Sequence, residues 1–438
     1  MKTLLQNCQT PDGIKNILIE DELIAYIGSQ TPDHDELLDC KGLVILPGMI
    51  DPHVHVRDLE KAYKETWETA SKAAIAGGIT TIMDMPNNKP ATTNLAGLRA
   101  KRKAAKKSLG NYKFHLGATE NNLEELREIL QENPEDVAGI KVFLAGSSSN
   151  EVVQNPEKLK AIFKLAKEFD KIVLIHSEMQ SVLDKWQKQI PEQSIEFHNI
   201  IRNREAAIAG TKLVLNLAEI TGAKLYICHV STREEIELIR KAKRTNKNIF
   251  CEVTPHHLVL DETILQKVGN FGKVNPPLRT KEDNAALLEA IKDGTFDCLG
   301  TDHAPHSLEE KKQDYSKTPS GFPGLETAIP MTYFLVKENH ISLEEYSKLI
   351  SGNAAKIFGL EKRGKIKIGN FADLVLIDPN KEWKINSKKF HSKAKYSPFE
   401  GREVRGKVVM CFVNGKNLLP FRRGDVRHWT DRGVRSDT

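Results

Sequence analysis

The motif His53-Val54-His55 is the sequence feature that most constrains this chain, because it closes an apolar run that begins near residue 42. Alternate side chains of a β-strand project from one face, so the pattern predicts that His53, His55 and Arg57 point together from a strand end. Two neutral imidazoles in this arrangement can bind one metal ion, and the neighbouring guanidinium favours an anionic ligand. Taken alone, the motif is equally compatible with two surface histidines on an edge strand.

Four later apolar segments contain, or lead into, another group that can contribute to a metal site. Lys141 lies within one such segment, His176 and His229 close two others, and Asp302 follows the fourth. A single histidine at such a position is more often a hydrogen-bonded core residue. Because the pattern recurs in four segments, it favours one metal site assembled from several strands.

The predicted strands alternate with helical or long loop segments from residue 43 onward. Eight such β/α units are typical of a closed parallel barrel, in which functional groups come from the carboxyl ends of the strands. The sequence therefore predicts the α/β class and a (β/α)8 TIM barrel, with the candidate ligands on strands one, four, five, six and eight. The predicted strands are 43–56, 79–85, 113–118, 138–144, 171–177, 224–230, 249–255 and 297–302.

Both ends of the chain consist of short apolar segments separated by polar turns, which is typical of small antiparallel sheets. Neither end alone offers enough strands for a stable sheet, so we expect the two ends to pair. The prediction is a small β-sandwich domain from 1–48 and 362–420 beside a barrel at 49–361. The polar, arginine-rich tail at 421–438 is expected to be a frayed terminus rather than an interaction arm.

Composition excludes several classes of partner. Lysine and arginine total 64 against 59 acidic residues, and the resulting net charge of +5 is too slight and too scattered to indicate nucleic-acid binding. The six cysteines are dispersed and read as buried thiols of a reducing compartment. No apolar run approaches the ~18 residues of a membrane span, and no signal pattern is present, so we expect a cytoplasmic protein without a membrane partner.

Six candidate ligands exceed the needs of one tetrahedral zinc ion, so we predict two zinc ions per chain. His53, His55 and Asp302 would hold one ion, and His176 and His229 the other. An ammonium group cannot bind a metal, but a neutral Lys141 amine can condense with carbon dioxide to an N6-carboxylated lysine that bridges both ions. The plainer alternative is that Lys141 packs its stem and extends its amine to solvent.

Water between two metal ions loses a proton near neutral pH and becomes a nucleophile. Asp302 would then act as general acid and base.

With these residues assembled, the sequence resembles the amidohydrolase superfamily over roughly residues 1–420, and within it the dihydroorotases of the longer type. The sequence motifs that are general to the superfamily specify no substrate, and they lie at residues 46–48, 359–360, 365–366 and 372–375. More specific motifs resemble those of the dihydroorotases, and they are Arg57 and residues 85–87, 275–279 and 302–306.

The resemblance implies the same six metal ligands and a defined set of substrate contacts. These contacts are His55, Arg57, Asn87, Asn275, His306, Ser320 and Gly321. It also implies an activity, the reversible cyclisation of N-carbamoyl-L-aspartate to L-dihydroorotate in de novo pyrimidine biosynthesis. One departure borders the site, because residues 58–63 replace the proline-glycine turn that usually follows the arginine.

Two other functions compete with this interpretation. A hydantoinase, dihydropyrimidinase or allantoinase would act on uncharged rings, which offer no carboxylate to match Arg57 and His306. An inactive homologue that serves as a structural partner of another pyrimidine enzyme would be expected to lack metal ligands, whereas all six are present. The expected partner is therefore a small-molecule substrate, and a homodimer is a possible assembly.

Overall fold

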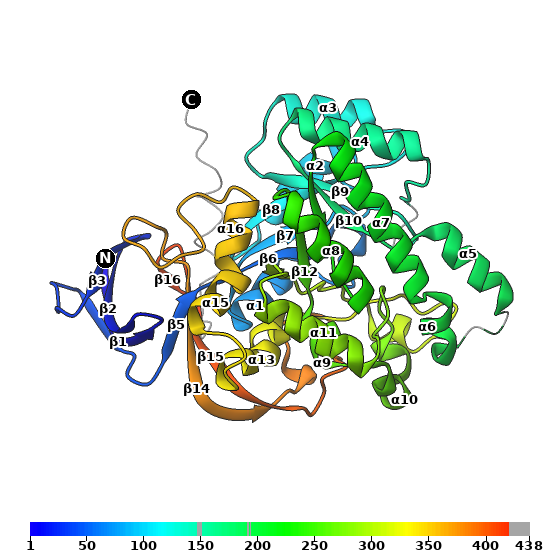
Figure 1. Ribbon diagram of the computed structural model, residues 1–438. Coiled ribbons are helices and arrows are strands. Elements are labelled where there is room, and N and C mark those ends of the chain that lie inside the picture. The colour runs from blue at the N-terminus through cyan, green and yellow to red at the C-terminus, as the bar shows by residue number, and fades with distance from the viewer. Residues whose placement is uncertain (147–150, 191, 193, 420–438) are drawn as a thin grey trace.

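The computed structural model describes residues 1–146, 151–190, 192 and 194–419, so the predicted tail at 421–438 lies outside the described residues. Two eight-stranded sheets organise the chain, a barrel surrounded by helices and a second sheet beside it (Figure 1). The structure confirms the TIM barrel and the separate β unit made from both chain ends. In the described part of the chain, no helix combines the length and apolar character needed to cross a membrane.

The barrel consists of eight strands that pair in sequence order, and each pair is parallel. A parallel bridge between Val54 and His303 joins the first strand to the segment after the last. All described residues of β9 and β10 are buried, as expected for strands covered on both faces. The strands are β6 (Met49–Val54), β7 (Ile79–Asp84), β8 (Asn111–Gly117), β9 (Val137–Phe143), β10 (Ile172–His176), β11 (Lys224–Ile227), β12 (Ile249–Val253) and β13 (Cys298–Leu299).

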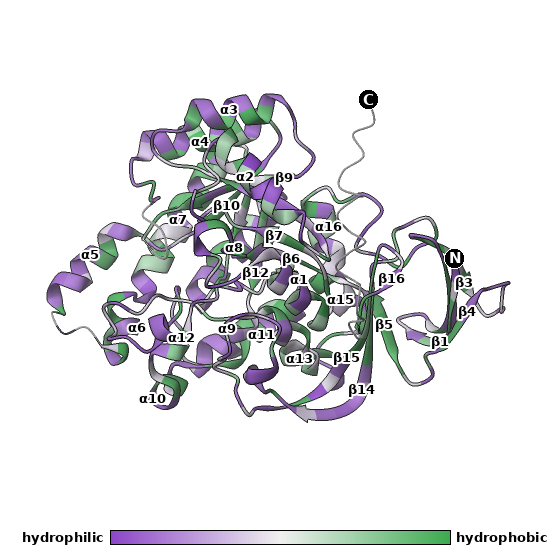
Figure 2. Ribbon diagram, turned by 180° about the vertical axis from the view of Figure 1, so that it is seen from behind, coloured by the Kyte–Doolittle hydropathy of each residue, from purple (hydrophilic) through white to green (hydrophobic). Residues whose placement is uncertain are grey.

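The outer helices are amphipathic, and α3 illustrates the pattern: Leu126, Ile129 and Leu130 are buried at helical spacing. Figure 2 shows hydrophilic and hydrophobic residues alternating along this helix. The helices are α1 (Trp67–Ala76), α2 (Leu95–Ala105), α3 (Leu123–Gln131), α4 (Pro156–Glu168), α5 (Gln180–Gln189), α6 (His198–Ile201), α7 (Arg204–Thr221), α8 (Arg233–Thr245), α9 (Pro255–Val259), α10 (Leu265–Val268), α11 (Lys281–Lys292), α12 (Leu308–Lys311), α13 (Ala328–Thr332), α14 (Phe334–Lys337), α15 (Leu343–Ser347) and α16 (Asn353–Ile357).

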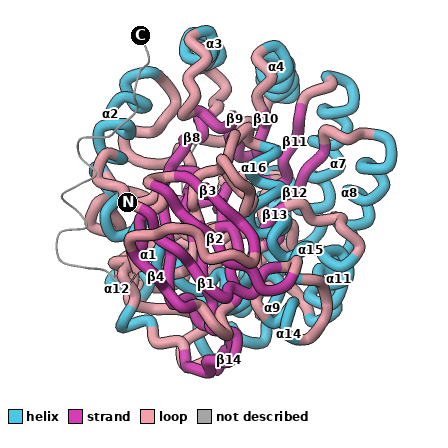
Figure 3. Tube along the Cα trace, turned by 90° about the vertical axis from the view of Figure 1, so that its left-hand side faces the viewer, coloured by secondary structure: helices cyan, strands magenta, loops and turns pink. Residues whose placement is uncertain are grey.

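The second sheet joins the two chain ends through β5, which pairs in parallel with β1 and antiparallel with β14. Figure 3 views the molecule from the side of this sheet, with barrel helices around its edge. Its order is β16-β15-β14-β5-β1-β2-β3, and β4 also pairs with β1. The strands are β1 (Lys2–Thr10), β2 (Gly13–Glu20), β3 (Leu23–Gly28), β4 (Glu36–Asp39), β5 (Val44–Pro47), β14 (Leu374–Lys384), β15 (Glu403–Val413) and β16 (Lys416–Asn417).

The strand predicted over 43–56 is wrong as one unit, because β5 and β6 belong to different sheets. The backbone changes partner at Gly48, whose N–H donates to Asp373 O at 2.9 Å, while the next N–H donates to Gly78 O. A side chain at Gly48 would collide with Thr80, because an added Cβ would lie 2.1 Å from its Cγ2. This change of partner lies next to the predicted domain limit at 48/49, and the exact limits stay a prediction.

A buried ion pair supports the carboxyl end of β7. Lys101 Nζ lies 2.8 Å from Asp84 Oδ2 and donates to Met85 O at 2.7 Å, and both charged side chains are fully buried. The other oxygen of Asp84 accepts from Val56 N at 2.8 Å. The pair therefore fixes the backbone beside the histidine motif.

Replacing Lys101 with Met leaves the Asp84 carboxylate buried without its counter-charge, which should cost roughly 3 to 5 kcal/mol of unfolding free energy. Denaturant unfolding should show the loss. Lys72→Met is the matched control, because Lys72 forms a partly exposed pair with Glu68 and should change stability by less than about 1 kcal/mol. Equal effects of the two substitutions would contradict the structural role of the buried pair.

Candidate metal and active site

His53, His55 and Asp302 come together at the carboxyl end of the barrel. His53 lies at the end of β6, His55 follows that strand, and Asp302 lies three residues beyond β13. The Nε2 atoms of the two histidines lie 3.3 Å and 3.1 Å from Asp302 Oδ1. His53, His229 and Asp302 also form a group whose potential ligand atoms lie within 4.8 Å of one another.

The hydrogen bonds of the Nδ1 atoms of His53 and His55 determine whether the Nε2 atoms that face Asp302 carry a hydrogen or a lone pair. His53 Nδ1 contacts Glu252 Oε1, and His55 Nδ1 lies 2.6 Å from Asn87 Oδ1. Both partners are acceptors, so each Nδ1 carries the hydrogen and each Nε2 keeps its lone pair. Two lone pairs therefore face a carboxylate oxygen at hydrogen-bond distance, an arrangement that repels unless a cation lies between the atoms. The donor set fits a divalent metal.

A second half of the site contains His176, His229 and Lys141. His176 Nε2 lies 2.8 Å from Glu178 Oε2, which leaves Nδ1 directed at His229 Nε2, 3.0 Å away. Lys141 is fully buried on β9, and its Nζ donates to Cys228 Sγ at 3.1 Å. Burial raises the pKa of the Cys228 thiol to about 12, so this neighbour is uncharged and does not neutralise an ammonium.

Burial also keeps the histidines unprotonated. It lowers the pKa of His53 to about 3, and it lowers the pKa values of His55 and His229 well below their usual range. The pKa of His176 is lowered as well, by burial, with Glu178 acting in the opposite direction. Neutral imidazoles are the form that binds metals, so the cluster is ready to act as a ligand set near neutral pH.

The site also holds backbone conformations of high energy. His229 and Asp302 have φ angles of 35° and 47°, and Arg57 has a φ of 67°. L-residues seldom adopt this region, and such residues cluster at functional sites.

The predicted alternation of His53, His55 and Arg57 on one strand face is wrong for the third residue. Strand β6 ends at Val54, and the positive φ of Arg57 turns its side chain away from the regular pattern. Its Nε donates to Pro305 O at 3.2 Å, and its Nη2 lies 3.2 Å from His306 Nε2. The structure nevertheless brings Arg57 and His306 together, although they are 249 positions apart in the chain.

A cavity opens over the ligand cluster. Lys141, Arg57, Asn87 and His306 lie outside its described lining, although Asn87 contacts His55, and His306 Nε2 lies 3.1 Å from the carbonyl oxygen of Ser320. The lining consists of His53, His55, Phe143, His176, His229, Val274, Asn275, Asp302, Ala304, Ser320 and Gly321.

Gly321 is a predicted substrate contact, but its backbone N–H and carbonyl groups are both hydrogen-bonded within the protein. Its N–H already donates to Lys273 O, and its carbonyl accepts from Lys311.

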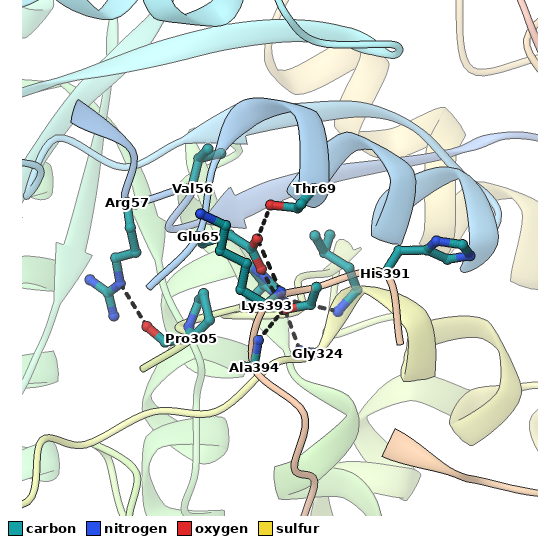
Figure 4. Close-up of polar contacts among 12 residues, drawn as sticks. Val56, Arg57, Glu65, Thr69, Pro305, Gly324, His391, Lys393 and Ala394 are labelled. Carbon is teal, nitrogen blue, oxygen red and sulfur yellow. Dashed lines mark hydrogen bonds and ion pairs between the residues drawn. The ribbon is translucent and has the colours of Figure 1, made fainter. Parts of the chain in front are cut away.

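The loop after β6 is tied to the C-terminal part of the chain. Figure 4 shows Arg57 directed at Pro305, and Glu65 facing Thr69 and the segment around Lys393. Glu65 accepts from the backbone N–H of Lys393 at 3.3 Å and lies 3.5 Å from His303 Nε2, beside Asp302. The residues on both sides of the unusual loop at 58–63 are therefore held at the edge of the site.

Comparison with known proteins agrees with this geometry. The protein-family model described as "Amidohydrolase family" matches residues 44–418 of the sequence. The chain belongs to the amidohydrolase family. This family comprises metal-dependent hydrolases, which is the class of enzyme that the ligand cluster supports.

Individual amidohydrolases are similar over almost the whole chain. A protein named Dihydroorotase from Methanosphaera stadtmanae is 36% identical over 95% of this chain and 96% of its own length. A Dihydroorotase from Anaplasma phagocytophilum is 36% identical over 87% and 84% of the two chains. Among solved structures, the L-hydantoinase (dihydropyrimidinase) from Arthrobacter aurescens has a TM-score of 0.91, with 29% identity over 95% of both chains.

Two buried glutamates of this amidohydrolase escaped the sequence interpretation. Glu252 on β12 contacts His53 Nδ1, and it also accepts from Tyr226 Oη and His229 N, each at 3.0 Å. Burial raises the pKa of Glu252, whereas the charge of Lys141 and the hydrogen bonds from His229 and Tyr226 act in the opposite direction and favour the carboxylate. Glu178, beyond β10, contacts His176 and Arg202. A carboxylate within the apolar run 249–253 was the available signal for Glu252, because an unpaired acid is rarely buried.

Glu252→Gln should weaken metal binding about 10- to 100-fold, because the amide is a poorer acceptor for His53 Nδ1–H and orients the ring less firmly. Titration with a competing chelator would measure the loss. Tyr226→Phe removes a hydrogen bond to the same carboxylate without changing its charge, and should have the smaller effect. Unchanged metal affinity in Glu252→Gln would contradict the orienting role.

Proposed function

We propose that this amidohydrolase is a dihydroorotase that interconverts N-carbamoyl-L-aspartate and L-dihydroorotate. The observation that carries the proposal is a buried cationic group, Arg57, which lies beside His306 next to a candidate metal cluster. A substrate that carries both a hydrolysable ring amide and a carboxylate matches these two features. The relatives named Dihydroorotase support the same substrate.

We further propose that His53, His55 and Asp302 hold one zinc ion and that His176 and His229 hold a second, with N6-carboxylated Lys141 as the bridge. Such a pair of ions would supply an activated water and polarise the amide carbonyl. Lys141 is fully buried, and the described hydrogen bond of its Nζ goes to the Cys228 thiol rather than to a carboxylate, which supports a modified amine at this position.

The protein's own residues would orient the ring and move the proton. Asp302 would take the proton of the attacking water as its oxygen adds to the ring carbonyl carbon. When the ring C–N bond breaks, Asp302 would return that proton to the leaving nitrogen. Arg57, Asn87 and His306 would hold the carboxylate. The remaining contacts would come from His55, Asn275, Ser320 and Gly321.

A second candidate is the hydrolysis of an uncharged cyclic amide such as hydantoin or dihydrouracil. The fold similarity to the Arthrobacter aurescens L-hydantoinase supports it. The buried guanidinium of Arg57 favours the charged substrate instead. A cytoplasmic location and a homodimer stay predictions from the sequence.

Arg57→Met tests the choice between these substrates. The substitution leaves the substrate carboxylate without its main counter-charge, a loss of roughly 2 to 5 kcal/mol. The kcat/KM for dihydroorotate should therefore fall about thirtyfold to several thousandfold. Steady-state assays with dihydroorotate, hydantoin and dihydrouracil would measure the change, and any turnover of the uncharged rings should fall far less.

Arg57→Lys is the matched control, because it keeps the charge and loses only the planar fork, so its loss should be intermediate. Metal content should be unaltered in both variants. Equal losses on charged and uncharged rings would assign Arg57 a structural role and remove the main reason for choosing dihydroorotate.

Lys141→Ala tests the proposed bridge. Removing the amine should abolish most activity and reduce the metal content, and short carboxylic acids should restore part of the activity by occupying the vacated space. Metal analysis and assays with and without added acetate would measure both effects. Wild-type activity and metal content in Lys141→Ala would refute the carbamate.

A further inference from the structure

His306 lies between two cationic side chains. Its Nδ1 is 3.0 Å from Lys64 Nζ, and its Nε2 is 3.2 Å from Arg57 Nη2 and 3.1 Å from the carbonyl oxygen of Ser320. Lys64 directly follows the unusual loop at 58–63, and His306 follows β13, so the contact joins distant parts of the chain. Lys64, Arg57 and His306 are all buried.

The chemistry of Lys64 and Ser320 favours one arrangement of the imidazole hydrogen. An ammonium group only donates, so Lys64 requires a lone pair on His306 Nδ1. The carbonyl of Ser320 only accepts, so it requires a hydrogen on Nε2. Both requirements are met by the neutral Nε2–H tautomer, and burial, with the charge of Arg57, lowers the pKa of His306 well below its usual range.

Glu310 holds Lys64 in place and does not compete for the ring. Its Oε1 lies 2.8 Å from Lys64 Nζ, whereas its Oε2 is 3.7 Å from His306 Nδ1, beyond hydrogen-bond distance. That Oε2 instead accepts from the backbone N–H of Ser307 at 3.0 Å.

The Nε2–H tautomer explains the contact between His306 and Arg57. Both facing groups are donors, and two donors 3.2 Å apart cannot bond to each other. They can both bond to one anion, with one donor for each carboxylate oxygen.

We propose that Lys64 is a positioning residue that fixes His306 as the Nε2–H tautomer, so that His306 and Arg57 present two adjacent donors to the substrate carboxylate. On binding, the Nε2–H moves from the carbonyl of Ser320 to the carboxylate, while Lys64 stays on Nδ1. The substrate in this inference rests on the proposed function, whereas the tautomer does not.

The first test is ¹⁵N NMR of histidine-labelled, metal-loaded protein, with the signals of His306 assigned by their loss in His306→Asn. The wild-type protein should show a protonated Nε2 and an unprotonated Nδ1, and Lys64→Met should shift the population toward Nδ1–H. Lys64→Arg should keep the wild-type tautomer because it retains a donor. An Nδ1–H tautomer in the wild-type protein would overturn the proposal, and this result does not depend on whether Lys64→Met folds. If Lys64→Met folds, an unchanged tautomer in that variant would also overturn it.

The second test is kinetic. Lys64→Met should raise the KM for dihydroorotate roughly 10- to 100-fold, the value of one charge-assisted hydrogen bond, with a much smaller change in kcat. Lys64→Arg should restore most of the affinity, and Lys72→Met on α1 is the control that should behave as wild type. Equal KM values for Lys64→Met and wild type would overturn the positioning role. If the wild-type protein does not turn over dihydroorotate, the proposed function fails, while the NMR result still decides the role of Lys64.

Discussion

Burial of polar side chains at the carboxyl end of the barrel is the constraint on which the site depends. It keeps the four histidines of the candidate metal site neutral. It also holds acceptors opposite acceptors in one place and donors opposite donors in another. Near Asp302, acceptors face one another at 3.1 to 3.3 Å, which suits a cation. Near Arg57 and His306, donors face one another at 3.2 Å, which suits an anion. In a solvated site water would satisfy both sets, whereas here a metal and a carboxylate ligand would do so.

The barrel closure holds these two sets in register. Asp51 on β6 accepts from Thr301 N at 3.1 Å and from Thr301 Oγ1 at 2.6 Å, so the first strand is bonded to the residue before Asp302. His55 N donates to His303 O at 2.8 Å on the other side of Asp302. The closing seam therefore joins the histidine motif to the proposed proton carrier. Glu65 also joins this seam to the segment between β14 and β15, because it contacts both His303 and the backbone of Lys393.

Much of the barrel was predictable because each strand is an apolar run between polar segments. The four later candidate ligands lie at or near strand ends, where parallel topology collects side chains from distant parts of the sequence. The sequence did not reveal the break at Gly48, because apolar residues continue across it and only the hydrogen-bond partners change. Alternation also failed at Arg57, since it holds only for extended backbone. Glu252 and Lys64 act through another side chain, and such contacts depend on tertiary geometry that spacing does not encode.

The proposed pair of ions joined by carboxylated Lys141 is the central claim of this account, and anomalous diffraction from zinc-loaded crystals tests it most directly. The account predicts two peaks about 3.5 to 4 Å apart, one beside His53, His55 and Asp302 and the other beside His176 and His229. Density for an added carboxyl group should extend from Lys141 Nζ between them. A single peak, or two peaks with an unmodified lysine, would contradict the account.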